Sequence, residues 1–382
     1  MFGETSRARA RVGDGAVSPS VGLPGLLAAP VPQDEPLRLA LASLSPAGRA
    51  ALLERIVFHR IDGLAHRAVE RLPQDALDPW LRFSLKRRSQ RCAAAALSQA
   101  LALGEILDAL HRSSIPVIVM GGIRTLEGTY GDASLRPLED HDLLVRHQEK
   151  EAARMALLRL GHAEQSRGLF RRGGVIVHLH VDPVGAHRRP ARQSLFPARV
   201  EDLFARAVWG HVAGAPSLLL EAEDELLLLA WYLVKHSFDR LVRVADVAHF
   251  VHRKRGSLDW ALLCRRAEAC GATRILGWSL QAAALLGVSV RALDRPVMQD
   301  DGPLARFLLS RVFHLRPMPY TGEALMALAA PTLRARVSFL LDALWPAGER
   351  PEEALRGAAA LPRRVVQLAE HGASRMARRR RM

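Results

Sequence analysis

The sequence predicts an α+β fold, with a small mixed sheet flanked by N-terminal helices and a C-terminal helical bundle. Three observations predict it: helical periodicity up to residue 111, short β-branched runs between 112 and 210, and helical periodicity again after 217. With 382 residues, 49% of them hydrophobic and 24% charged, the chain is long enough for one large core or two smaller ones. The expected regions are a disordered leader (1–35), an N-terminal helical segment (36–111), an α/β core (112–210), a C-terminal helical domain (217–345) and a basic tail (346–382).

The N-terminal third divides at about residue 36. Residues 1–35 are rich in Gly, Pro, Ser and Ala without periodicity, a composition typical of a disordered leader. From 36 to 111, apolar residues recur three and four positions apart, as in the run that starts WLRFSLKRRSQ. This spacing predicts three or four packed helices.

The α/β core begins at 115-IPVIVMGG-122, which predicts a buried strand ending in a tight turn at two glycines. A second strand is expected at 142-DLLV-145, and an amphipathic helix over 149–160 that Gly161 closes. The segment 169-LFRRGGVIVHLHV-181 predicts a hairpin with its turn at Gly173 and Gly174.

After 217 the helical pattern returns in four successive runs, each ending near a glycine or a polar break, and again over 332–345. This pattern predicts a helical bundle packed beside the α/β core.

The net charge of +15 and the pI near 11.0 raise the question of a nucleic-acid partner, because clustered cations attract phosphates. Only four of the 54 basic residues are lysine, and the arginines are scattered, with one dense cluster at 375-RMARRRRM-382. Three tyrosines offer little for base stacking. Nucleic acid is therefore an open partner that the sequence does not favour.

Location follows from the apolar stretches and the cysteines. Apolar runs such as 226-LLLLAWYLV-234 are about half of the roughly 20 residues that span a bilayer, and the N-terminus does not suit a signal peptide. We expect no membrane span and a cytoplasmic protein. Cys92, Cys264 and Cys270 cannot form a closed disulfide framework, and they lack the paired spacing of a zinc site.

Two aspartates in 136-RPLEDHDLLVRH-147 are the first candidate for chemistry. Residues i and i+2 of a strand face the same side about 6.5 to 7 Å apart, so Asp140 and Asp142 would project together. Carboxylates placed in this way can hold Mg²⁺ together with nucleotide phosphates. The alternative is an acidic turn that solvates the start of a strand.

The turn at Gly121 and Gly122 is the second candidate, since backbone N–H groups at such a turn can bind phosphate oxygens. Arg136 could reach a phosphate with its planar guanidinium. The structural alternatives are a turn that needs positive φ and an ordinary loop arginine.

The order VIVMGGIRT, RPLEDHDLLV, GHAE and VIVHLHVDP resembles the uncharacterised nucleotidyltransferase family of the DNA polymerase beta-type superfamily. The later segment 231-WYLVKHSFDRLVRVADVAHFV-251 resembles that family's helix pair, with a matching Lys235-His236 and a matching Asp246. The resemblance covers roughly residues 45 to 290. It implies that 112–210 is a nucleotidyltransferase-like core.

The resemblance implies that Asp140 and Asp142 are catalytic and bind Mg²⁺ (or Mn²⁺), and that Gly121 and Gly122 contact the triphosphate. A nucleoside monophosphate would pass from a nucleoside triphosphate to an unidentified acceptor hydroxyl or phosphate. Lys235-His236 and Asp246 would either hydrogen-bond between helices, which we favour, or line the acceptor cleft.

Two positions depart from the family pattern. Met120 stands where lysine is frequent, and Arg124 is the candidate to replace that cation at the nucleotide, together with Arg136. His178 stands where superfamily enzymes use a third carboxylate, and histidine is a poor Mg²⁺ ligand. Alternation along the strand places His178, His180 and Asp182 on one face, which gives the candidate metal ligands Asp140, Asp142, His178, His180 and Asp182.

Four readings therefore stay open. The favoured one is a metal-dependent nucleotidyltransferase, and a single ion such as Mn²⁺ or Zn²⁺ bound by the two aspartates and a histidine is one form of it. The others are a catalytically inactive nucleotide-binding or regulatory relative, a tRNA-directed nucleotidyltransferase, and a metal-dependent hydrolase that uses the histidine strand.

Overall fold

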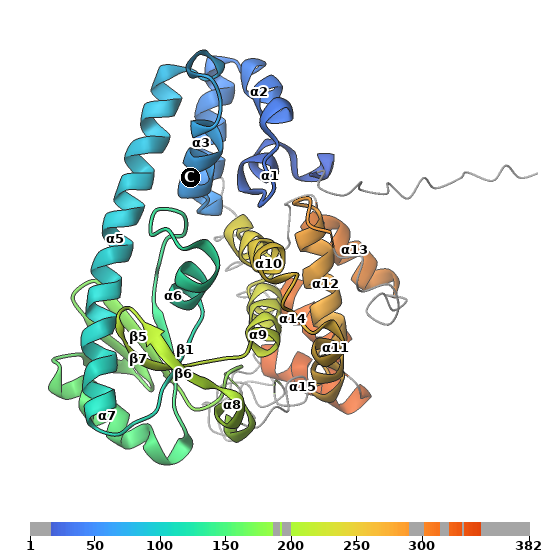
Figure 1. Cartoon of the computed structure of the whole chain (residues 1–382). Coiled ribbons are helices and arrows are strands. Elements are labelled where there is room, and N and C mark those ends of the chain that lie inside the picture. The colour runs from blue at the N-terminus through green and yellow to red at the C-terminus, as the bar shows by residue number, and fades with distance from the viewer. Residues whose placement is uncertain are drawn as a thin grey trace, which may run out of the picture.

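The computed structural model describes residues 17–185, 192, 200–289, 302–313, 321–330 and 332–344. It confirms the predicted α+β class: one mixed seven-stranded sheet carries helices on both faces, and a bundle of helices lies beside it (Figure 1). The predicted basic tail, 346–382, and residues 1–16 of the predicted leader lie outside the described residues.

The N-terminal helices are α1 (Gly22–Ala28), α2 (Asp34–Ala42), α3 (Pro46–His59), α4 (Asp62–Glu70) and α5 (Pro79–Arg112), with short 3-10 turns at Pro19–Val21 and Gln74–Ala76. The sequence marks two of their starts clearly. Ser45 accepts a hydrogen bond from the Gly48 backbone N–H, and Asp78 accepts from Trp80 and Leu81, with proline next in both cases. The prediction of three or four packed helices over 36–111 is confirmed.

The prediction of a disordered leader is wrong for residues 17–35, which form α1 and the start of α2. Leu27 and Ala28 are fully buried, and α1 packs against α4 and α10. The segment is too short to show periodicity, but burial of its few apolar side chains against the rest of the fold offsets the entropy of ordering it.

Helix α5 runs along one face of the sheet and contacts α4, α7 and β7 (Figure 1). It is the one helix among the described residues that is long and apolar enough to cross a membrane, with a mean hydropathy of 1.4 over its most apolar window. Helices of soluble proteins also pass this test, so the property by itself assigns no location.

The sheet has the order β3-β4-β5-β2-β1-β7-β6. Parallel pairing joins β2 to β5 and β1 to β7, and the other neighbouring strands are antiparallel. The strands are β1 (Ile118–Met120), β2 (His141–Leu144), β3 (Ala163–Ser166), β4 (Leu169–Arg172), β5 (Val175–His180), β6 (Val208–Val212) and β7 (Ala215–Leu219). Between them lie α6 (Gly122–Thr125), a π-helical turn (Leu126–Tyr130), a 3-10 turn (His147–Glu149), α7 (Lys150–Arg159) and α8 (Val200–Arg206).

The four predicted strands and the helix over 149–160 are confirmed, but β3 and the β6-β7 hairpin were not predicted. Its turn uses Ala213 and Gly214, both at positive φ, and β7 pairs with β1 through Ile118 and Leu218. The sheet therefore extends past residue 210. The sequence APSLL shows no alternation, because Pro216 interrupts it and the strand lies inside the fold.

The remaining helices form the bundle: α9 (Ala222–Lys235), α10 (Leu241–Lys254), α11 (Trp260–Ala269), α12 (Thr273–Ala284), α13 (Pro303–Phe313), α14 (Thr321–Ala329) and α15 (Leu333–Leu344). Helix α9 packs against α10, α11, α12 and α14, and the side chains of Trp231 and Trp278 are buried among them. One continuous apolar core joins this bundle to the sheet and to the N-terminal helices.

The pleat of β2 sorts its side chains between two environments. His141 and Leu143 are fully buried. Asp142 points to the opposite face, where residues of α9 and α10 lie across a cavity from it. The candidate site therefore lies between the sheet and the first two helices of the bundle.

Candidate functional site

A cavity of about 370 Å³ lies at the junction of the sheet, α9 and α10. Charged side chains of both signs line it, together with the glycine turn and a few apolar residues. Its lining comprises Arg60, Gly121, Gly122, Arg136, Pro137, Glu139, Asp140, Asp142, His178, His180, Leu229, Tyr232, Leu233, Lys235, His236, Val242, Arg243 and Asp246.

Asp140 and Asp142 both face this cavity, as their spacing predicts. Asp142 lies in the middle of three neighbouring strands, since it pairs with Met120 of β1 on one side and with His178 of β5 on the other. Asp140 precedes β2, and its side chain is more exposed than that of Asp142, at 44% against 18%.

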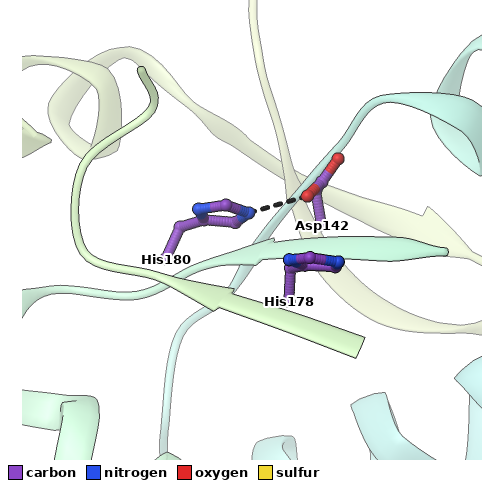
Figure 2. Close-up of side chains that lie close together, drawn as sticks. All are labelled: Asp142, His178 and His180. Carbon is purple, nitrogen blue, oxygen red and sulfur yellow. Dashed lines mark hydrogen bonds and ion pairs between the residues drawn. The ribbon is translucent and has the colours of Figure 1, made fainter. Parts of the chain in front are cut away.

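His178 and His180 project from β5 to the same side of the sheet as Asp142 (Figure 2). The Nε2 atom of His180 lies 2.7 Å from Asp142 Oδ1, and the Nε2 atom of His178 lies 3.5 Å from Asp140 Oδ2. The two imidazole rings are stacked, with centroids 5.9 Å apart. One ligand atom each from Asp142, His178 and His180 lies within 4.8 Å of the others, a spacing that suits one metal ion.

The two carboxylates differ in proton affinity. Burial raises the pKa of Asp142, but the hydrogen bond with His180 and the positive charges of His180 and Lys235 outweigh burial and hold the pKa at about 2. Burial and the neighbouring charge of Asp142 raise the pKa of Asp140. Asp142 is therefore ionised at neutral pH. Ionisation of Asp140 beside it is unfavourable unless a cation is present.

The glycine turn lies against the same carboxylate. Gly121 has φ 71°, in the left-handed region, and a methyl group at its Cα would lie 3.1 Å from Asp142 Oδ2. A methyl group on Gly122 would lie 2.6 Å from Arg136 Nη1. Both positions bring backbone close to charged groups, and the two predicted motifs share one wall of the cavity.

Arg136 also lines the cavity, but its guanidinium is bonded to the bundle. Its Nε and Nη2 atoms donate to Asp246 of α10 at 3.0 and 2.9 Å. The hydroxyl of Tyr130 donates to the same carboxylate at 3.0 Å. Burial lowers the pKa of Arg136, but Asp246 more than offsets this and raises it. This buried pair joins the α/β core to the bundle.

Two other predicted residues lie outside the lining. Arg124 points toward α9, where its Nη2 lies 3.3 Å from Glu225 Oε2. Asp182 follows the end of β5 at His180, so strand alternation does not reach it, and its Oδ1 accepts from the Val184 backbone N–H at 3.1 Å. Neither is among the described residues that line the cavity. Their binding roles stay predictions.

Lys235 and His236 line the cavity from the end of α9. The ammonium of Lys235 lies 5.1 Å from the centre of the Tyr232 ring. Burial, together with the charges of Arg243 and Lys235, lowers the pKa of His236 to about 3, so its ring is neutral at pH 7. In the described structure Asp246 bonds with Tyr130 and Arg136.

Sequence reasoning missed several lining side chains, and three of them bear on the chemistry of the cavity. Arg60 and Arg243 bring positive charge from α3 and α10, and the buried Tyr232 hydroxyl has no hydrogen-bond partner among the described residues. Burial raises the pKa of Tyr232 well above its usual range, so the hydroxyl stays protonated and can donate a hydrogen bond to a ligand. A tyrosine within an apolar helix, or one arginine among many, has no sequence feature that distinguishes it from a structural or surface residue.

Comparison with known proteins agrees with this geometry. No curated protein and no solved structure matches the chain. The sequence model of one family, described as uncharacterised nucleotidyltransferase, matches residues 45–287, which is more than half of the chain. The match begins at the N-cap of α3 and ends after α12, so it includes α3, α4 and α5, the sheet, the cavity and the first helices of the bundle. The chain therefore belongs to the uncharacterised nucleotidyltransferase family.

Proposed function

We propose that the protein is a metal-dependent nucleotidyltransferase, which moves a nucleoside monophosphate from a nucleoside triphosphate to an acceptor hydroxyl or phosphate. One observation carries the proposal: the ionised Asp142 and the left-handed Gly121 lie side by side on one wall of a cavity. A triphosphate with its cation can contact both at once.

The donor set fits a divalent cation. Asp140 and Asp142 supply oxygen ligands, and His178 and His180 supply nitrogen ligands from the neighbouring strand. Mixed oxygen and nitrogen donors suit Mn²⁺ better than Mg²⁺, because imidazole is a softer ligand than carboxylate. When bound, the cation neutralises charge on the triphosphate and on the departing pyrophosphate.

The residues of the chain supply positioning and charge. Asp140 and Asp142 would bind the cation, and the glycine turn lets the phosphates approach the backbone closely. Lys235 adds a positive charge at the same end of the cavity, where its field already lowers the pKa of Asp142. Apolar side chains of α9 and α10, Leu229, Leu233 and Val242, reduce the contact of these groups with water, which strengthens their electrostatic effect.

The test is nucleotide transfer by the purified full-length protein. Each of the four common nucleoside triphosphates is incubated with Mn²⁺ or Mg²⁺ and a pool of small-molecule acceptors. Pyrophosphate release is followed, and mass spectrometry identifies products that have gained a nucleoside monophosphate. We expect Asp140→Asn and Asp142→Asn to abolish both signals, while Asp108→Asn, which removes an exposed carboxylate on α5, retains them. Activity of both site variants equal to that of the unchanged protein would refute the proposal.

A catalytically inactive nucleotide-binding relative is the second candidate. The observation that favours it is His178, which stands on β5 where a third carboxylate is expected, with His180 already hydrogen-bonded to Asp142. Calorimetry of nucleotide binding and the pyrophosphate assay together separate the two candidates. The inactive relative binds a nucleoside triphosphate and releases no pyrophosphate with any acceptor, whereas the enzyme does both.

A further inference from the structure

A second cavity, of about 420 Å³, lies next to the first and is lined by four arginines: Arg60, Arg88, Arg91 and Arg240. We call it the arginine cavity. It shares Arg60 and Pro137 with the first cavity, so the two are neighbours across a single layer of side chains. Helices α3 and α5 form one side of it, and the residue before α10 forms the other.

The arginine cavity has an excess of positive charge. Its lining contains one carboxylate, Asp62, which forms an ion pair with Arg88. Arg60 bonds to Glu139, and Arg240 donates to the Phe58 carbonyl with its guanidinium 4.4 Å from the Phe58 ring centre.

Arg91 is the least engaged of the four. Within the described ranges its guanidinium forms no ion pair or hydrogen bond, and its side chain is exposed beside the cavity. Two paired carboxylates, Asp62 and Glu139, against four guanidinium groups leave a surplus of positive charge that favours a doubly charged anion.

Arg60 marks the junction between the cavities in two ways. Its φ of 58° ends α3 in the left-handed conformation, where glycine is the usual residue and a side chain costs about 1 kcal/mol. Burial lowers its pKa, and the charges of Arg136, Arg240 and Arg243 lower it further. Glu139 offsets part of this repulsion, and an anion bound in the arginine cavity would offset more of it.

We propose that the arginine cavity binds a phosphate group of the acceptor, so that the acceptor is a small phosphorylated molecule. This inference rests on the proposed function, because the triphosphate is assigned to the wall formed by Asp142 and Gly121. The acceptor must then reach the first cavity from another side, and the arginine cavity adjoins it there. No aromatic side chain is among its described lining residues, so it offers no stacking surface for a nucleic-acid base.

Inorganic phosphate is the probe, titrated calorimetrically into the full-length protein with and without a saturating non-hydrolysable nucleoside triphosphate and Mg²⁺. We expect phosphate to bind in both cases. Arg91→Gln weakens phosphate binding roughly tenfold and Arg91→Lys restores part of it, because a charge-assisted hydrogen bond from a guanidinium is lost and then replaced by a point charge. The affinity for the triphosphate analogue stays within about twofold in both variants.

Arg87→Gln is the matched control. It removes the same charge from an exposed position one turn earlier on α5 that does not line the cavity, and it should leave phosphate affinity unchanged. Circular dichroism checks that all variants are folded.

Each adverse outcome has its own meaning. Equal phosphate affinity in the unchanged protein and in Arg91→Gln overturns the inference, and so does loss of analogue binding in Arg91→Gln, which would assign the cavity to the triphosphate. A short 5′-phosphorylated oligoribonucleotide that binds at least tenfold tighter than phosphate, with a steep salt dependence, overturns it in favour of RNA. Failure of the proposed function is a separate result, since it appears as absence of analogue binding to the unchanged protein.

Discussion

Two groups of acidic residues line the same cavity, and they differ in the kind of partner each has. At the sheet, Asp142 is paired with the imidazole of His180. At the bundle, Asp246 is held by the bidentate guanidinium of Arg136 and by a tyrosine hydroxyl. An imidazole can turn its nitrogen lone pair to a cation that the carboxylate also binds, whereas a guanidinium has no lone pair to offer. The sheet end therefore has the donor set that the proposed ligand needs, whereas the bundle end has an ion pair that joins the α/β core to the bundle.

The largest expected effect is on stability at the bundle end. Asp246→Ala leaves the buried Arg136 without its carboxylate, and we expect the free energy of unfolding to fall by about 3 to 5 kcal/mol. Urea denaturation followed by circular dichroism measures it. Asp34→Ala, which breaks the exposed pair with Arg71, is the control and should cost at most about 1 kcal/mol. Similar losses in the two variants would contradict a structural role for Asp246.

The next effect concerns pH at the bundle end, where the His249 ring lies 4.9 Å from that of Tyr130. Burial outweighs the hydrogen bond to Ala28 and lowers the pKa of His249 from 6.5 to about 4. Because the unfolded chain then takes up the proton first, the free energy of unfolding falls as pH drops from 6.5 to about 4.

In that window His249 contributes a slope of about 1.4 kcal/mol per pH unit. Denaturation of His249→Gln at several pH values should show a slope smaller by this amount, since the variant has no titrating group there. Parallel curves for the two proteins would show that His249 is not buried in its neutral form.

At the sheet end the expected pattern is reversed. Asp142→Asn keeps an oxygen to accept from His180 but loses the charge, so we expect stability within about 1 kcal/mol of the unchanged protein. Affinity for a nucleoside triphosphate with Mn²⁺ should fall about ten- to hundredfold, measured by calorimetry. If Asp142→Asn lowered the free energy of unfolding as much as Asp246→Ala, the two ends of the cavity would not differ in their structural role.

The smallest effect is expected at Arg124. Because this side chain points to Glu225 and away from the cavity lining, Arg124→Gln should change triphosphate affinity by no more than about twofold. Lys235→Met is the comparison, since Lys235 lines the cavity, and it should weaken binding roughly tenfold. An equal loss of triphosphate affinity in both variants would support the nucleotide-binding role that the sequence suggested for Arg124.

Much of the site was predictable because its parts are local. The strand-glycine turn at 118–122, the two aspartates at the start of β2 and the paired histidines of β5 each depend on a backbone period of two or on a turn that glycine permits. Their order along the chain also identified the family. Asp182 shows the limit of this reasoning, because alternation holds only while the strand continues, and β5 ends at His180.

Long-range partners were not predictable. The pairing of Arg136 with Asp246 spans 110 residues, and the approach of Arg60 to the cavity depends on how α3 packs. Helix α1 and the β6-β7 hairpin are stabilised by neighbours more than by their own patterns. Nothing in one arginine among many distinguishes a cavity cation from a surface charge.

The sequence by itself determined the fold class, the family and the candidate residues Asp142, His178 and His180, since these depend on periodicity and motif order within short segments. Only the tertiary structure decided which carboxylate meets an imidazole, which meets a guanidinium, and where the unbalanced arginines gather. The physical reason is that charge interactions depend on distance and burial, and both are set by how segments far apart in the chain pack together.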